Sequence, residues 1–189
     1  MRISILTLIL FFTTTASALY TELGLNYNYK KTVIDSLNQT EQQGSTVSVS
    51  FYFWEHVALE LSYTNSLYVK KERNDSATSS TSQRVTTQYA DIYGTDLIYV
   101  LADKKAPFQP YIKGGGAYIS KRQVSQVDNN PFSEAGPYKG WAPSYGVGLK
   151  FFLSETFAIR AGWDVVRTPI DNTSYADDLT GRVGVSWML

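Results

Sequence analysis

Eight segments of this sequence alternate apolar and polar residues with a period of two, and no other feature constrains the fold as strongly. Successive side chains of a β-strand point to opposite faces, so each segment predicts a strand with one apolar and one polar face. The segments begin near Leu19, Val47, Val57, Ile92, Tyr111, Ser144, Phe157 and Leu179. The sequence therefore predicts an all-β domain.

The connections between these segments alternate in length. Short ones cover residues 54–56, 102–109 and 154–156, and long polar ones cover about 30–43, 70–84, 121–140 and 168–176. This alternation puts the short turns on one side of the sheet and the long loops on the other, as in transmembrane barrels. We therefore predict an eight-stranded antiparallel up-and-down transmembrane β-barrel over residues 19–189, with short periplasmic turns and long extracellular loops.

The first 18 residues have the features of an export signal. Arg2 gives a positive start, residues 3–12 are nearly all apolar, and Ala16-Ser17-Ala18 fits a small-residue cleavage site. The apolar run is shorter than the roughly 20 residues that a membrane helix needs. We predict a cleaved signal peptide over residues 1–18, which would export the barrel.

Composition removes several classes of function. The sequence has no cysteine, which excludes disulfides and thiolate metal sites, and a single histidine, His56, which leaves little for triad or metal chemistry. Lys plus Arg number 17 and Asp plus Glu number 17, so no net positive charge favours nucleic acid. We expect no cofactor, no metal and no nucleic-acid partner.

The polar phase of the strands contains as many acidic as basic residues, together with several glycines. Burying a lone charge is costly, so balanced charges beside small residues suit a narrow lumen better than a solvent-facing surface. The charged set comprises Glu22, Glu60, Asp96 and Asp164 with Lys113, Lys150, Arg160 and Arg182. Because side chains fill the interior of an eight-stranded barrel, we interpret this set as a structural charge network.

Aromatic residues gather towards the ends of the strands, as in the belts that membrane barrels place at the two bilayer interfaces. The set expected on the short-turn side comprises Phe53, Trp54, Phe108, Tyr111, Phe151, Phe152, Phe157 and Trp187. The set expected on the other side comprises Tyr27, Tyr29, Tyr63, Tyr89, Tyr93 and Tyr118.

The last eight residues, Arg-Val-Gly-Val-Ser-Trp-Met-Leu, resemble the C-terminal signal that outer-membrane barrels present to the assembly machinery. Arg182, Gly184, Trp187 and Leu189 hold the polar, glycine, aromatic and terminal places, with Leu189 where Phe is usual. The Pro-Tyr-Ile-Lys-Gly-Gly-Gly stretch at 110–116 is similar to a strand of the small bacterial outer-membrane barrels, the superfamily of the OmpA membrane domain, OmpX and OmpW. This resemblance implies the bacterial outer membrane as the location. It also implies barrel-assembly machinery and periplasmic chaperones as partners during biogenesis.

These observations favour a non-enzymatic barrel with a structural or surface-interaction role through its extracellular loops. A hydrolase would need a nucleophile beside a base, and His56 lies in a short turn with no suitable serine nearby. Basic residues at the loop bases could meet lipopolysaccharide phosphates: Lys30, Lys31, Lys70, Lys71, Arg73, Lys121 and Arg122. Two alternatives remain open, a small channel for ions or small hydrophobic solutes and a soluble periplasmic ligand-binding β-barrel.

Overall fold

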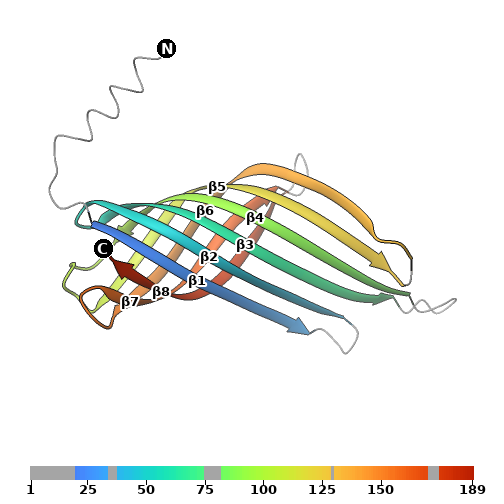
Figure 1. Ribbon diagram of the computed structural model, residues 1–189, viewed down its shortest axis with the longest axis horizontal. Coiled ribbons are helices and arrows are strands. Elements are labelled where there is room, and N and C mark those ends of the chain that lie inside the picture. Colours follow the sequence, from blue (N-terminus) through green and yellow to red (C-terminus); the bar gives the residue numbers. More distant parts are fainter. Residues whose placement is uncertain (1–19, 34–37, 75–81, 129, 170–174) are drawn as a thin grey trace, which may run out of the picture.

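The computed structural model describes residues 20–33, 38–74, 82–128, 130–169 and 175–189, which form one closed barrel (Figure 1). Each strand pairs antiparallel with the next, and β1 closes the ring against β8. The strands are β1 Tyr20–Val33, β2 Gln39–Trp54, β3 Val57–Asn74, β4 Ser82–Val100, β5 Phe108–Val127, β6 Ser133–Phe152, β7 Phe157–Pro169 and β8 Tyr175–Met188. The expected signal peptide, residues 1–18, lies outside the described residues. In the part of the chain that is described, no helix is long and apolar enough to cross a membrane.

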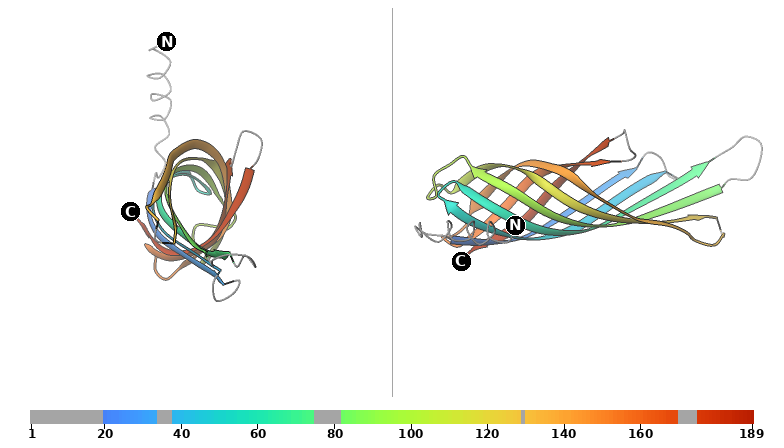
Figure 2. Two further views of the ribbon diagram at one scale, coloured as in Figure 1. Left: turned by 90° about the vertical axis from the view of Figure 1, so that its right-hand side faces the viewer. Right: turned by 90° about the horizontal axis from the view of Figure 1, so that it is seen from above.

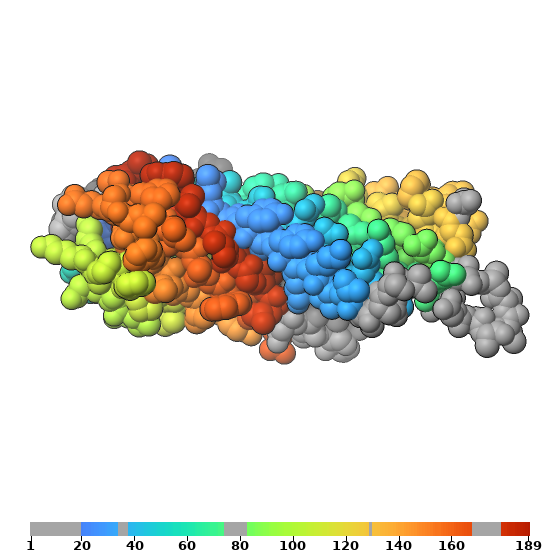
Figure 3. All heavy atoms as spheres, turned by 90° about the horizontal axis from the view of Figure 1, so that it is seen from below, coloured from blue at the N-terminus to red at the C-terminus, as the bar shows by residue number. Residues whose placement is uncertain are grey.

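The apolar phase of the strands faces outward. Leu25 is 47% exposed, Leu97 is 51% exposed and Val147 is 51% exposed, while their polar-phase neighbours are buried or half-buried. Such a band of outward apolar side chains suits lipid and would be unfavourable in water. The alternative of a soluble barrel, which needs its apolar phase inside, is therefore wrong. Figure 3 shows how tightly β8 and β1 lie side by side in this outer wall.

Aromatic rings pair across neighbouring strands at both ends of the band. On the side of the short connections, here called the turn side, Phe157 lies 5.1 Å from Trp187 between ring centres. On the opposite side, the loop side, Tyr63 lies 5.2 Å from Tyr93. Tyr111, which we expected in the turn-side belt, points into the barrel instead and is only 6% exposed, because it belongs to the inward phase of β5.

The strands continue far into the segments that the sequence suggested were loops. The hairpins β3–β4 and β5–β6 reach furthest beyond the rest of the barrel on the loop side (Figure 2). Pairing of β3 with β4 runs out to Asn74 and Ser82, whereas β1 pairs with β8 only over residues 22–27. The alternation of apolar and polar residues fades where both faces of a hairpin meet water, so periodicity underestimates these strands. The result is a barrel with one tall wall on the loop side.

Candidate functional site

The lumen of the barrel brings the predicted charged residues together. Nearest the turn side, the Lys150 ammonium donates short hydrogen bonds to the carboxylate of Glu22 and the hydroxyl of Tyr52. The Tyr52 hydroxyl in turn donates to Glu22 Oε2 at 2.7 Å. Lys150 and Glu22 have no exposed surface, so their charges must be compensated by groups inside the lumen, first by each other.

Arg160 links this group to the next one along the lumen axis. Its Nη1 lies 3.8 Å from Glu22 Oε1, and its Nη2 donates to Glu60 Oε2 at 3.0 Å. Glu60 also accepts hydrogen bonds from Ser50 and, on its other oxygen, from the Lys113 ammonium, both at 3.3 Å. A single carboxylate from β3 therefore joins cations from β7 and β5.

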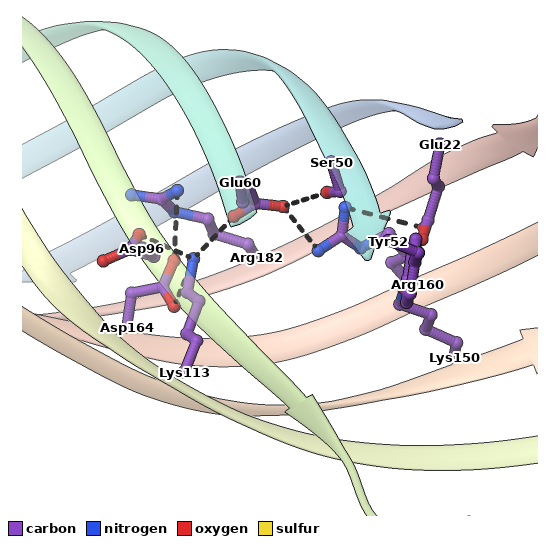
Figure 4. A network of polar contacts seen from close by, with 10 residues as sticks. All are labelled: Glu22, Ser50, Tyr52, Glu60, Asp96, Lys113, Lys150, Arg160, Asp164 and Arg182. Carbon is purple, nitrogen blue, oxygen red and sulfur yellow. Dashed lines mark hydrogen bonds and ion pairs between the residues drawn. The ribbon is translucent and has the colours of Figure 1, made fainter. Parts of the chain in front are cut away.

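Lys113 extends the network towards the loop side. Its ammonium lies 3.1 Å from Asp164 Oδ1 and 3.7 Å from Asp96 Oδ2. Asp164 then pairs with Arg182, with Oδ2 3.0 Å from Nη1, and Asp96 accepts a short hydrogen bond from Ser144. All eight predicted residues thus lie in one connected, charge-balanced network, shown in Figure 4.

Glycines of the same phase make room for the long side chains. A Cβ on Gly148 would collide with the ring of Tyr111, and a Cβ on Gly24 would come within 2.8 Å of Arg160 Nη1. The Gly-rich polar phase seen in the sequence therefore has a steric cause, because the lumen is too narrow for a side chain at every inward position.

An apolar and aromatic layer closes the turn side of the lumen. It consists of Tyr52, Ala58, Ile98, Val100 and Tyr111, with Tyr20 stacked on Tyr52 at 4.2 Å between ring centres. Among the charged residues above this layer, two cavities have volumes of only about 20 and 10 Å³. Each is about the size needed for one water molecule, so this half of the lumen is packed.

The loop-side half of the lumen contains a larger cavity of about 280 Å³, here called the cup. Its lining combines polar residues, including Asn28, Gln42 and Gln88, with apolar residues, including Ile92, Ile119 and Val166. Arg182 lines both the cup and the two small cavities, so it lies at the boundary between cup and network.

Sequence reasoning missed both the cup and the role of Tyr52. The inward position of Tyr52 was readable from the strand phase, but its contact with Glu22 and Lys150 depends on which strands face one another across the barrel. The cup residues are mostly neutral, and neither their types nor their spacing distinguish them from ordinary barrel positions.

The predicted basic residues at the loop bases divide between the two faces. Lys70 follows Tyr68 on the inward phase and pairs with Glu72 at 2.6 Å, which raises the pKa of the Lys70 ammonium. Lys71 lies on the outward phase of the same strand, as does Arg122 on β5, whose guanidinium lies 5.3 Å from the ring centre of Tyr89. The Nε of Arg122 also lies 3.6 Å from Glu134 Oε1. Arg122 therefore lies beside the loop-side aromatic residue Tyr89, and Lys71 lies further along β3 than Tyr63.

The residues of the expected assembly signal lie on β8 and at its end. Arg182 faces the lumen, a Cβ on Gly184 would collide with the backbone of β1, and Trp187 packs on Phe157. Leu189 is exposed, and its amide donates to the carbonyl of Thr21 at 2.8 Å. His56 lies in the β2–β3 turn, with its ring 6.3 Å from that of Tyr99 between centres.

Comparisons with known proteins agree with this architecture. The family model described as "Outer membrane protein beta-barrel domain" matches residues 4–188. The N-terminal β-barrel domain of Pseudomonas aeruginosa OprF superposes with a TM-score of 0.55 at 15% identity, covering 90% of this chain and 97% of that one. Neisserial surface protein A superposes with a TM-score of 0.52 at 14% identity, covering 92% of this chain and 97% of that one. OprG from Pseudomonas aeruginosa superposes with a TM-score of 0.53 at 8% identity, covering 90% of this chain and 95% of that one. No curated protein matches the sequence.

Proposed function

Because this chain belongs to the outer membrane protein β-barrel domain family and is located in the bacterial outer membrane, we propose that it is a closed, non-enzymatic barrel that acts through its extracellular surface. The observation that carries this proposal is the packed turn-side half of the lumen. The charge network and the aromatic layer beneath it fill the cross-section, leaving cavities of about 20 and 10 Å³. A barrel sealed in this way meets partners through its wall and its outer hairpins.

The tall hairpins β3–β4 and β5–β6 supply that surface. Both extend beyond the rest of the barrel on the loop side, which is the extracellular side in this family (Figure 2). Functional residues commonly lie on segments that a rigid scaffold presents to solvent. The ion-paired lumen keeps the scaffold rigid, and the hairpins present their side chains from it.

Lipopolysaccharide is the first partner that we propose for this surface. Lys71 and Arg122 are outward basic residues at the loop-side aromatic residues, Arg122 beside Tyr89 and Lys71 further along β3 than Tyr63, where the phosphates of the outer leaflet would lie. Cationic side chains at that depth neutralise phosphate while the rings occupy the interface.

The proposal is tested by the free energy of unfolding of the barrel in bilayers with and without lipopolysaccharide. We expect lipopolysaccharide to stabilise the native barrel, and Lys71→Gln with Arg122→Gln to remove most of that gain. Lys70→Gln is the matched control, because Lys70 is the neighbour of Lys71 on the same strand but lies on the inward phase. Equal stability in the two bilayers, or equal losses in the two variants, would refute the lipopolysaccharide contact.

The absence of catalysis is also part of the proposal. His56 lies in a turn-side turn beside Tyr99, at the opposite end of the barrel from the cup and the hairpins. Purified barrel should therefore release no fatty acid from phospholipid or lipid A, and His56→Ala should behave as the parent protein. Hydrolysis that His56→Ala abolishes would show that the barrel is an enzyme.

A small channel is the second candidate function. The cup favours a channel, because this cavity of about 280 Å³ extends the open space partway down the lumen. Conduction would then require the network below the cup to rearrange, with Lys113 or Arg182 exchanging carboxylate partners. The permeation measurement at the end of the Discussion distinguishes a channel from a sealed barrel.

A further inference from the structure

We propose that the cup binds a small amphipathic carboxylate, a molecule with one carboxylate group and an apolar body, taken up from the extracellular side and held above the charge network. The proposal goes beyond a surface role for the hairpins, and binding in the cup does not depend on whether the lumen beneath it is sealed. Its basis is the size of the cavity, the chemistry of its walls and a buried donor at its boundary.

The size of the cup selects a small ligand. Its volume of about 280 Å³ lies just below the roughly 300–1,000 Å³ of sites for drug-sized molecules. A molecule built on one aromatic ring or a short aliphatic chain would occupy such a space. The packed network beneath, with its cavities of about 20 and 10 Å³, would stop it from passing further.

The lining of the cup favours an amphipathic ligand. Ile92, Ile119 and Val166 form an apolar surface, and Ile119 belongs to a small buried apolar cluster that Ile92 and Val166 pack against. In the same lining, Asn28, Gln42 and Gln88 offer side-chain amides, which donate and accept hydrogen bonds. An apolar body would bury against the apolar residues, and polar atoms would be satisfied by the amides.

The charges of the cup favour an anion. Lys121 and Arg182 are part of its lining, and none of the described residues that line it is acidic. Arg182 also belongs to the charge-balanced network, where it pairs with Asp164, so the cup adds Lys121 as a further cation to its lining. An anion in the cup would meet two cations without facing a carboxylate of the lining.

Arg182 supplies a donor that the protein leaves unused. Its Nη1 pairs with Asp164 at 3.0 Å, but its Nε is buried and has no hydrogen-bond partner among the described residues. A guanidinium carries five N–H donors, and an unsatisfied buried donor costs free energy. A small shift of the Arg182 side chain would bring this donor to a carboxylate in the cup, with a charge-assisted bond that is stronger than one to a neutral acceptor.

Binding is measured by fluorine NMR with two probes of the same shape, 4-fluorophenylacetate and its neutral amide, 4-fluorophenylacetamide. The refolded barrel is placed in phosphatidylcholine nanodiscs, and empty nanodiscs correct for partition into lipid. We expect saturable line broadening for the acid and affinity for the amide weaker by about tenfold. Broadening equal to that of empty nanodiscs would overturn the binding site, and equal affinities would overturn its preference for an anion.

Substitutions in and beside the cup test whether the probes bind there. Ala90 lines the cup, so Ala90→Trp should fill it and abolish binding of both probes, whereas Tyr89→Trp, one residue away on the outer face, should bind as the parent. Arg182→Gln should lower the affinity for the acid to that for the amide and leave the amide unchanged. Native folding is checked by heat-dependent gel mobility, and Val166→Trp replaces Ala90→Trp if the latter does not fold. Parental binding in a folded cup-filling variant would overturn the proposal.

The binding experiment and the permeation experiment test the two proposals independently. Nanodiscs have no enclosed volume, so a leaky lumen does not alter the binding result. A barrel that lets solute through but binds the acid would contradict the proposed function alone. A sealed barrel that does not bind it would contradict this inference alone.

Discussion

The two halves of the lumen are built from the same inward phase of the same eight strands, yet they differ in packing. The turn-side half combines four acidic and four basic residues with an aromatic layer, and its residues Glu22, Lys150 and Ser50 have no exposed surface. The loop-side half has mostly amide, hydroxyl and aliphatic side chains, with Lys121 and Arg182, around a cavity of about 280 Å³. The comparison indicates that long, paired charges fill a narrow barrel, whereas shorter neutral residues leave space.

The largest expected effect comes from breaking an ion pair in the packed half. Lys150→Met would remove the nearer cation of buried Glu22, leaving only Arg160 Nη1 at 3.8 Å, and should lower the free energy of unfolding by about 3–5 kcal/mol. The measurement is urea unfolding in liposomes, followed by tryptophan fluorescence. Adding Glu22→Gln to Lys150→Met should restore part of the loss, since the buried carboxylate charge is then removed. A loss below about 1 kcal/mol in the single variant would show that this half is hydrated like a surface.

Removing one hydroxyl from the same half should have a smaller effect. Tyr52→Phe deletes the hydrogen bond to Glu22 and the acceptor for Lys150 while keeping the ring stacked on Tyr20. Hydrogen bonds to charged groups contribute about 1.5–3 kcal/mol, so a loss in this range is expected in the same unfolding assay. Tyr63→Phe, which removes an exposed hydroxyl bonded to Asp91, is the control and should cost less.

Two glycine-to-valine substitutions compare a crowded position with one that has room for a side chain. Gly148→Val would push a side chain into the ring of Tyr111 and should destabilise the barrel by about 1–3 kcal/mol. Gly181→Val is the matched variant on β8, because the nearest atom to an added Cβ there, Trp163 Nε1, lies at an ordinary contact distance of 3.5 Å. If the two variants unfolded at the same urea concentration, the steric account of the turn-side half would be wrong.

The smallest effect is expected in the cup. Gln88→Ala removes an amide from a cavity wall without uncovering a charge, so the change in unfolding free energy should stay within about 0.5 kcal/mol. Urea midpoints of this variant and the parent give the comparison. A loss as large as that of Tyr52→Phe would mean that the cup is as tightly packed as the network.

The sequence predicted more of the strands than of their contacts. Alternation identified the eight strands and put Glu22 and Lys150 on the inward face, because side-chain direction follows directly from position in a strand. It did not show that Lys150 on β6 meets Glu22 on β1, since contact across a barrel depends on strand stagger as well as phase. Tyr111 was assigned to the interface because it is an aromatic residue near a strand end, although its phase on β5 turns it inward.

The loop side was the least predictable region. Periodicity ended near residues 70 and 121, whereas pairing continues to Asn74 on β3 and Val127 on β5. Hairpins exposed on both faces need no apolar face, so the sequence there carries no clear strand signal. The cup lies close to this region and is lined largely by neutral residues. No sequence motif therefore predicted it.

Solute permeation tests the central claim most directly, namely that the turn-side half of the lumen is a packed core. Liposomes with the refolded barrel are shifted into isotonic arabinose, and swelling is recorded against empty liposomes and liposomes with a large porin. We predict swelling no faster than in empty liposomes, because the network and the Tyr52–Tyr111 layer fill the lumen. Swelling above that of empty liposomes, abolished by substituting Lys150 or Arg160, would contradict the account and establish an open path.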